Sequence, residues 1–169
     1  MIYPNNFETK IGFDTIRRVL EKQCMSPLGV AHCKEMRYYS NYDLINQKLR
    51  ETNEFLAIIT AQAEFPLNDF HDVTPALNAI RAQGSYMPAD ELFRLRKSLG
   101  TIGAISSFFI KSNEEGVTPY PHLSELCSGM QSFNPILKEI DCIIDKFGNI
   151  KDNASPELLS IKQAIQATT

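Results

Sequence analysis

The sequence predicts an all-α fold, an elongated bundle of antiparallel amphipathic helices. Apolar residues recur at steps of three and four, the spacing of one helix face. Pairs of a hydroxyl residue and proline punctuate this pattern, and only residues 149–152 have the composition of a short hairpin turn. With 169 residues, of which 43% are hydrophobic and 22% charged, the chain is long enough to bury a core. We therefore expect a single helical module over residues 1–169.

The hydroxyl–proline pairs predict where three helices begin. The side-chain oxygen can accept a hydrogen bond from an unpaired backbone N–H, and proline at the first helical position lacks a donor that would stay unpaired. Helices should therefore open at Ser26-Pro27, Thr74-Pro75 and Ser155-Pro156.

The first sixty residues predict three helices. An amphipathic helix over 14–24 is followed by one over 26–39. The third carries the clearest apolar stripe, which should pack in an antiparallel pair or a coiled-coil-like seam. The members of this stripe are Ile45, Leu49, Thr52, Leu56 and Ile59.

The rest of the chain predicts five more helices and one exposed loop. The helices run from Thr74 to near Gly84, from Pro88 as a long central helix, over 122–131, over 135–147 and from Ser155 onward, with the loop over 111–121. Two of them have clear apolar faces. These are Leu92, Leu95, Leu99, Ile102 and Phe109 in the central helix, and Ile136, Ile140, Ile143, Ile144 and Phe147 in the helix over 135–147.

Glycines are expected to shape two of these helices. Gly100 and Gly103 could permit a close helix crossing or a kink, of which we favour the packing role, and Gly148 should stop the helix over 135–147. The pattern of the last helix is still running at Thr169, which indicates a cut rather than a natural terminus.

Composition excludes several classes of protein. No apolar run approaches the roughly 20 residues of a membrane span, and residues 1–6 are not the start of a secretory signal. A cytoplasmic protein without a membrane partner is expected. The four cysteines are widely spaced, predict buried thiols, and form neither a zinc nor a redox motif. They are Cys24, Cys33, Cys127 and Cys142.

No motif in the sequence predicts catalysis. Phosphate-binding glycine loops, a nucleophile elbow and a zinc helix are all missing from the sequence, so no catalytic, cofactor-binding or metal-ligating residue is expected. Asp141 and Asp145 would share one helix face, as a carboxylate pair for acid–base chemistry or a metal would. A solvated helix face is the interpretation we favour, and an enzyme built on this pair is the alternative.

Only the first third of the chain is mildly basic. Residues 1–50 carry eight Lys and Arg against five Asp and Glu, while the net charge of the whole chain is −3. Cationic side chains could meet a phosphate backbone there, although the interleaved Glu21 and Glu35 favour an ordinary exposed face. The candidate nucleic-acid-binding residues are Arg18, Lys22, Lys34 and Arg37.

Three strings carry a resemblance to a known family. They are Phe7-Glu8-x-Lys10-Ile11-Gly12-Phe13-Asp14-x-Ile16-Arg17, Ser26-x-Leu28-Gly29, and Phe147-Gly148-x-Ile150-x-Asp152-x-Ala154-Ser155-Pro156-Glu157-Leu158-x-x-Ile161. The chain resembles, over nearly its whole length, the N-terminal region of MutS-family DNA mismatch repair ATPases of the second bacterial branch. Those homologues lack the mismatch-reading domain and usually carry a C-terminal Smr nuclease.

The resemblance implies the N-terminal core and the start of the lever arm of a larger protein. In that family these helices connect an ABC-type ATPase, which uses ATP and Mg²⁺, to a DNA-embracing clamp. The ATPase, clamp and nuclease domains would lie outside residues 1–169, and no catalytic residue of the family maps onto this chain. The intact protein would be a homodimeric ATPase, with endonuclease activity where the nuclease domain is present.

Three hypotheses about function follow. The first is a non-catalytic module that transmits motion in such an ATPase, acting on branched or mismatched DNA or, within the same family, in the rescue of collided ribosomes; residues 152–158 are then a structural turn. The second is a free-standing helical adaptor that binds a protein through the stripe over 45–59 or over 92–109. The third is the enzyme that uses Asp141 and Asp145.

Overall fold

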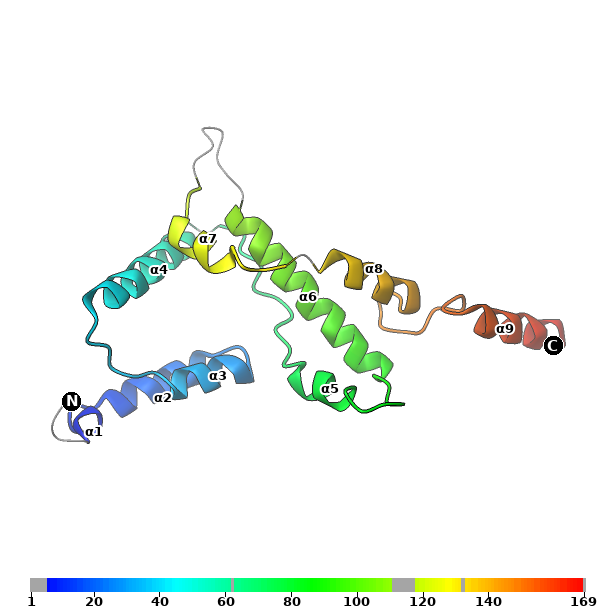
Figure 1. The fold of residues 1–169 in the computed structure, drawn as a ribbon, viewed down its shortest axis with the longest axis horizontal. Coiled ribbons are helices and arrows are strands. Elements are labelled where there is room, and N and C mark those ends of the chain that lie inside the picture. The colour runs from blue at the N-terminus through cyan, green and yellow to red at the C-terminus, as the bar shows by residue number, and fades with distance from the viewer. Residues whose placement is uncertain (1–5, 62, 111–117, 132, 169) are drawn as a thin grey trace. The chain divides into compact units, whose positions relative to one another are not determined.

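The structure, a computed structural model, describes residues 6–61, 63–110, 118–131 and 133–168 (Figure 1). These residues form nine α-helices and no β-strand, which confirms the all-α prediction. The chain divides into two compact units, residues 1–45 and 46–169, which we describe separately. That the whole chain acts as one module stays a prediction.

The first unit contains α1 (Phe7–Lys10), α2 (Phe13–Gln23) and α3 (Pro27–Lys34). Between α1 and α2, Gly12 adopts a left-handed φ of 79°. The Ser26 hydroxyl accepts a hydrogen bond from Gly29 N at 3.1 Å, so the predicted cap of α3 is confirmed. The helix ends at Lys34 and not near Tyr39 as predicted, and the Met36 carbonyl accepts from the Arg17 side chain instead.

Helix α4 (Tyr42–Thr60) contains the boundary between the two units. Its first turn is capped by the Asn41 side chain, which accepts from Leu44 N at 3.0 Å. The predicted apolar stripe is exposed in the described structure, with Leu49 61% and Leu56 58% accessible, so its expected burial in a helix seam is wrong. Ile58, at 1% accessible, lies on the face that is buried instead.

An aromatic cluster forms the core of the second unit. It brings together the C-terminal ends of α4 and α6 (Ala89–Ile110) and the short α7 (Pro121–Cys127). The Phe65 ring lies 5.2 Å from Phe108, 5.3 Å from Phe55 and 5.5 Å from Phe109, centroid to centroid. Rings at these separations and tilts add to the stabilisation from apolar burial. The buried members are Ile58, Phe109, Leu123 and Cys127.

A carboxylate of α4 completes the N-terminus of α7. Glu54 accepts hydrogen bonds from the backbone N–H groups of His122 and Leu123, at 3.1 and 2.9 Å. A negative charge there satisfies two unpaired donors and complements the helix dipole. α7 ends at Cys127, before the predicted Gln131, and of the predicted loop over 111–121, residues 111–117 lie outside the described residues.

The segment before α5 (Thr74–Ala79) lies along α6. The buried Ser98 hydroxyl accepts from His71 N at 3.3 Å, and Thr101 donates to the Asn68 carbonyl at 2.8 Å. Thr74 is the first residue of α5, so Val73 and not the threonine is at the N-cap, and Thr74 N donates to the Asp72 side chain at 3.0 Å. The predicted hydroxyl cap is therefore wrong here, and α5 also ends before the predicted Gly84.

α6 does not show the close helix crossing predicted at its glycines. A Cβ atom added at Gly100 or Gly103 would meet no described atom within 4 Å. These two residues instead line a surface hollow of about 420 Å³ between α6 and residues 130–131 and 133–137.

Helix α8 (Asn134–Ile143) ends earlier than predicted. Ile144 is extended and pairs with Ile150 in an antiparallel bridge, so the short hairpin expected near 149–152 is present around a turn. Gly148 does not cap the helix but forms this turn with a φ of 87°. A Cβ there would lie 3.0 Å from the Phe93 ring. Of the predicted apolar face, only Ile140 and Ile144 are buried.

The last described helix is α9 (Pro156–Thr168). The Ser155 hydroxyl accepts from Leu158 N at 3.2 Å, which confirms the third predicted cap.

Truncation of the aromatic cluster tests this description of the core. Phe109→Ala should lower the free energy of unfolding by about 3–5 kcal/mol, because the ring is 5% accessible and its loss leaves a cavity. The matched control is the neighbouring Ile110→Ala, at a side chain 57% accessible, for which we expect a change within about 0.5 kcal/mol. Urea unfolding followed by helical circular dichroism measures both; equal losses would contradict the assignment of the core.

Candidate functional site

The four candidate nucleic-acid-binding residues all lie in the first unit with exposed side chains. Arg18 and Lys22 are one turn apart on α2, Lys34 is the last residue of α3, and Arg37 follows it. None of the four has a carboxylate partner among the described residues; Arg18 Nε donates only to the Asp14 carbonyl, at 3.3 Å. Their charges are therefore available to an anion.

The structure does not gather these four cations into one cleft. Lys34 lines a shallow hollow formed by residues 24–31, whereas Arg37 lines a different hollow beside Phe7 and Tyr38. The sequence thus correctly predicts that each of these four cations is exposed. In the described structure they offer an anion separate points of contact and not one binding surface.

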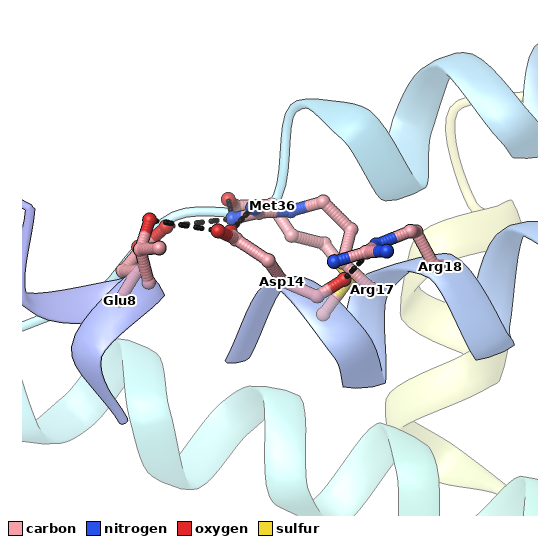
Figure 2. A network of polar contacts seen from close by, with 6 residues as sticks. Glu8, Asp14, Arg17, Arg18 and Met36 are labelled. Atoms are coloured by element: carbon pink, nitrogen blue, oxygen red, sulfur yellow. Dashed lines mark hydrogen bonds and ion pairs between the residues drawn. The ribbon is translucent and has the colours of Figure 1, made fainter. Parts of the chain in front are cut away.

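Arg17 forms the densest polar network of the first unit, shown in Figure 2. Its guanidinium pairs with Glu8 at 2.7 Å and with Asp14 at 3.1 Å, and it donates to the Met36 carbonyl at 3.0 Å. It also lies over the Phe13 ring, 5.1 Å from its centroid. The hydrogen bond to Glu8 is the largest cause that raises the pKa of Arg17. One side chain of α2 thereby ties together α1, α2 and the residues after α3.

The network around Arg17 was not predicted from the sequence. The signal lies in the first family string, in which the carboxylates of Glu8 and Asp14 both accept hydrogen bonds from Arg17. Thr9 completes the set by donating to Asp14 at 2.7 Å. The charges of this string serve local structure and do not form an open site.

The third family string, over residues 147–161, also has a structural account. Ser155 caps α9, and Lys162 pairs with Asp152 across the turn before that helix. The pKa of Glu157 is lowered by hydrogen bonds from the backbone N–H of Glu157 itself and from Ser155. Such contacts are those of a helix-opening turn, as predicted for residues 152–158.

The two carboxylates considered for catalysis perform different tasks. Asp141 forms an ion pair with Arg96, with oxygen–nitrogen distances of 2.7 and 3.3 Å, which joins α8 to α6. Asp145 accepts from the backbone N–H groups of Phe147 and Asn149 inside the turn. Arg96 lowers the pKa of Asp141, and the hydrogen bond from Asn149 is the largest cause that lowers the pKa of Asp145. Both groups are stabilised as carboxylates, whereas a general acid needs a raised pKa.

The described residues contain no group of three or more His, Cys, Asp or Glu side chains that could hold a metal ion. Across the same ranges, no helix combines the length and the apolar character needed to cross a membrane.

The cysteines differ from the prediction of four buried thiols. Cys127 is buried in the aromatic cluster, and Cys142 is exposed. Cys24 and Cys33 are half-buried and adjacent, with their sulfur atoms 3.4 Å apart. A search for closely spaced cysteines could not find this pair, because the turn between α2 and α3 brings together residues nine positions apart.

The described residues form a helical chain. Its charged side chains stabilise the ends of helices and the contacts between neighbouring helices. Comparison with curated proteins gives relatives named Endonuclease MutS2. The one from Alkaliphilus oremlandii (strain OhILAs) is 30% identical over 155 residues, which are 92% of this chain and 19% of the relative. The one from Alkaliphilus metalliredigens (strain QYMF) is 30% identical over 148 residues, 88% of this chain and 18% of the relative.

A third relative of that name, from Leuconostoc citreum (strain KM20), is 29% identical over 157 residues, 92% of this chain and 20% of the relative. No family model matches the chain. No solved structure matches it either. The chain spans about a fifth of the length of these curated relatives and is related in sequence to a MutS2 segment of that size.

The ion pair of Asp141 predicts a pH-dependent contribution to stability. Because Arg96 holds the pKa of Asp141 below its ordinary value of 3.8, the stabilisation is present above about pH 4 and is lost as the pH falls through the lowered pKa. Asp141→Asn should cost about 0.2–1 kcal/mol at pH 7, since the pair is partly exposed. The difference from the unaltered chain, measured by urea unfolding, should shrink as the pH falls below 3.8 and through the lowered pKa.

A matched control uses a carboxylate for which the structure gives no ion pair. Glu139→Gln removes the same charge from the same helix, at an exposed side chain. A loss for Asp141→Asn that stays constant down to pH 2 would show that the charge of Asp141 is not its source.

Proposed function

We propose that this chain is a non-catalytic helical module from the N-terminal part of a MutS2-like ATPase. The observation that carries the proposal is the similarity of about nine tenths of the chain to a fifth of proteins named Endonuclease MutS2. ATP and Mg²⁺ binding, homodimerisation and any endonuclease activity belong, in this proposal, to other parts of the longer protein.

The described contacts support a mechanical role. Helix ends are fixed by side chains, as at Glu54, Ser26 and Ser155, and helix pairs are joined by ion pairs such as Arg96–Asp141. Packed, capped helices move as units when a neighbouring domain changes conformation. The module would transmit such movement between an ATPase and a DNA-binding clamp.

A second candidate function rests on the exposed stripe of α4. Leu49, Leu56 and Ile59 are each about 60% accessible in the described structure. Apolar side chains at helical spacing are one face of a helix-to-helix interface. A free-standing adaptor that binds another protein through this stripe would expose it in the same way.

The gene that encodes the chain distinguishes the two functions. The ATPase module requires coding sequence that continues past Thr169 and reaches a Gly-x-x-x-x-Gly-Lys-Ser/Thr loop, because the chain itself lacks one. Sequencing the gene through this region tests the requirement. A stop codon directly after Thr169 would exclude the ATPase module and favour the adaptor.

Contacts with nucleic acid, where the chain makes them, are proposed for Arg18, Lys22, Lys34 and Arg37. With a net charge of −3 and the clamp outside residues 1–169, the chain alone should bind linear or branched DNA with a Kd no tighter than about 10⁻⁵ M near physiological salt. Fluorescence anisotropy at several salt concentrations measures this binding. At low salt, the remaining affinity should fall when all four residues are replaced by alanine.

The control removes four exposed cations elsewhere, in the variant Arg50→Ala, Arg81→Ala, Lys138→Ala and Lys146→Ala. It carries the same change in net charge, so an equal loss of affinity would reject the proposed surface. Tight binding by the unaltered chain, with a steep salt dependence abolished in the first variant, would instead show that this chain is itself a DNA-binding domain.

A further inference from the structure

Two thiols face each other at the turn between α2 and α3. Cys24 follows the last residue of α2, and Cys33 lies in the last turn of α3. Their sulfur atoms are 3.4 Å apart, and Cys24 Sγ also lies 3.3 Å from the Leu20 carbonyl oxygen. A disulfide has a sulfur–sulfur distance of about 2.0 Å, so closure requires a movement of little more than an ångström.

The backbone around the pair holds it in place. The Ser26 cap and Gly29 lie directly beside Cys24; a Cβ at Gly29 would be 3.4 Å from the Cys24 Cβ and 3.5 Å from its sulfur. The glycine and the capped helix start thus allow α3 to approach the end of α2 closely. The two cysteines are brought together by the fold of the first unit alone.

The pair is also accessible. Both side chains are half-buried, and Cys24 lines an open surface hollow together with Met25, Val30 and Lys34. The ammonium group of Lys34 at this hollow favours approach of a small anionic reagent. Hydrogen bonding to Cys33 is the largest cause that raises the pKa of the Cys24 thiol, which favours its protonated form.

We propose that Cys24 and Cys33 form a reversible intramolecular disulfide with a low-molecular-weight disulfide as oxidant. One protein thiol loses its proton, and its thiolate attacks a sulfur of the small disulfide, which releases one small thiolate and leaves a mixed disulfide. The second protein thiol, as thiolate, attacks the protein sulfur of this intermediate and releases the other small thiolate. The protein loses two protons and two electrons, and the small disulfide becomes two thiols.

The consequence is a covalent bond between the end of α2 and the end of α3. The bond closes a loop that contains the Met25–Ser26 turn, and it restricts opening of the two helices. The modification would therefore fix Lys34 and the two α2 cations on one rigid hairpin.

The test titrates the purified full chain with oxidised and reduced glutathione, followed by alkylation and peptide mass spectrometry. The peptides that contain Cys24 and Cys33 should lose two hydrogen masses, at a rate independent of protein concentration, and dithiothreitol should restore them. Exposed Cys142 is the internal control: with no thiol partner among the described residues, it should acquire a glutathione adduct. The Cys24–Cys33 disulfide should form at a ratio of oxidised to reduced glutathione at least about tenfold lower than the ratio at which the Cys142 adduct forms. The reason is that the second attack is intramolecular.

Single variants separate the chemistry from the folding of the chain. In Cys24→Ser or Cys33→Ser, the remaining thiol should stop at the glutathione adduct, while the helical circular dichroism of the chain is unchanged. In the unaltered chain, oxidation should slow amide hydrogen exchange across residues 20–34. Glutathione adducts on both cysteines, disulfides between chains, or formation at the same ratio as the Cys142 adduct would each overturn the proposal.

Discussion

A helix can bury its apolar stripe only against another surface, and this constraint governs the whole chain. Among the described residues, six hydrophobic side chains are buried, in the aromatic cluster and at Ile140 and Ile144. Far more large hydrophobics remain exposed, among them Ile16, Leu49 and Ile161. Because apolar burial is the main favourable term in folding, stability must then depend on small clusters and on well-made helix ends.

The polar groups meet that requirement by fixing helix ends and contacts between elements. Arg17 joins α1, α2 and the residues after α3, while Glu54 completes the N-terminus of α7. Each of these contacts links positions distant in sequence at modest energetic cost, since the charged groups are only partly removed from water. A segment organised in this way suits a role in which helices hold or move other parts, as proposed from its MutS2 relatives.

Local sequence rules predicted the helices well, but they predicted poorly which helix faces are buried and which side chains meet. Serine before proline gave correct starts at Ser26 and Ser155, because a cap depends on a few neighbouring atoms. At Thr74 the rule failed, because the helix begins one residue earlier: Val73 is at the N-cap, and its carbonyl accepts from Leu77 N. The face of α4 that is buried could not be predicted, because it is decided by the aromatic side chains of α6 and by Phe65, not by the strongest stripe.

The same limit applies to the candidate site. The exposure of the four cations followed from amphipathic spacing, whereas the Arg96–Asp141 pair and the Cys24–Cys33 pair depend on tertiary approach. Spacing alone placed Asp141 and Asp145 on one face. It could not show that one carboxylate is used by a neighbouring helix and the other by its own turn.

Gly148 shows how one small residue can control the direction of the chain. Its left-handed backbone disfavours any side chain, and the space beyond its α-carbon is already filled by the Phe93 ring. A methyl group there would strain the turn and press on the long helix at the same time. The direction in which the chain runs from α8 to α9 therefore depends on a turn at which no larger residue fits.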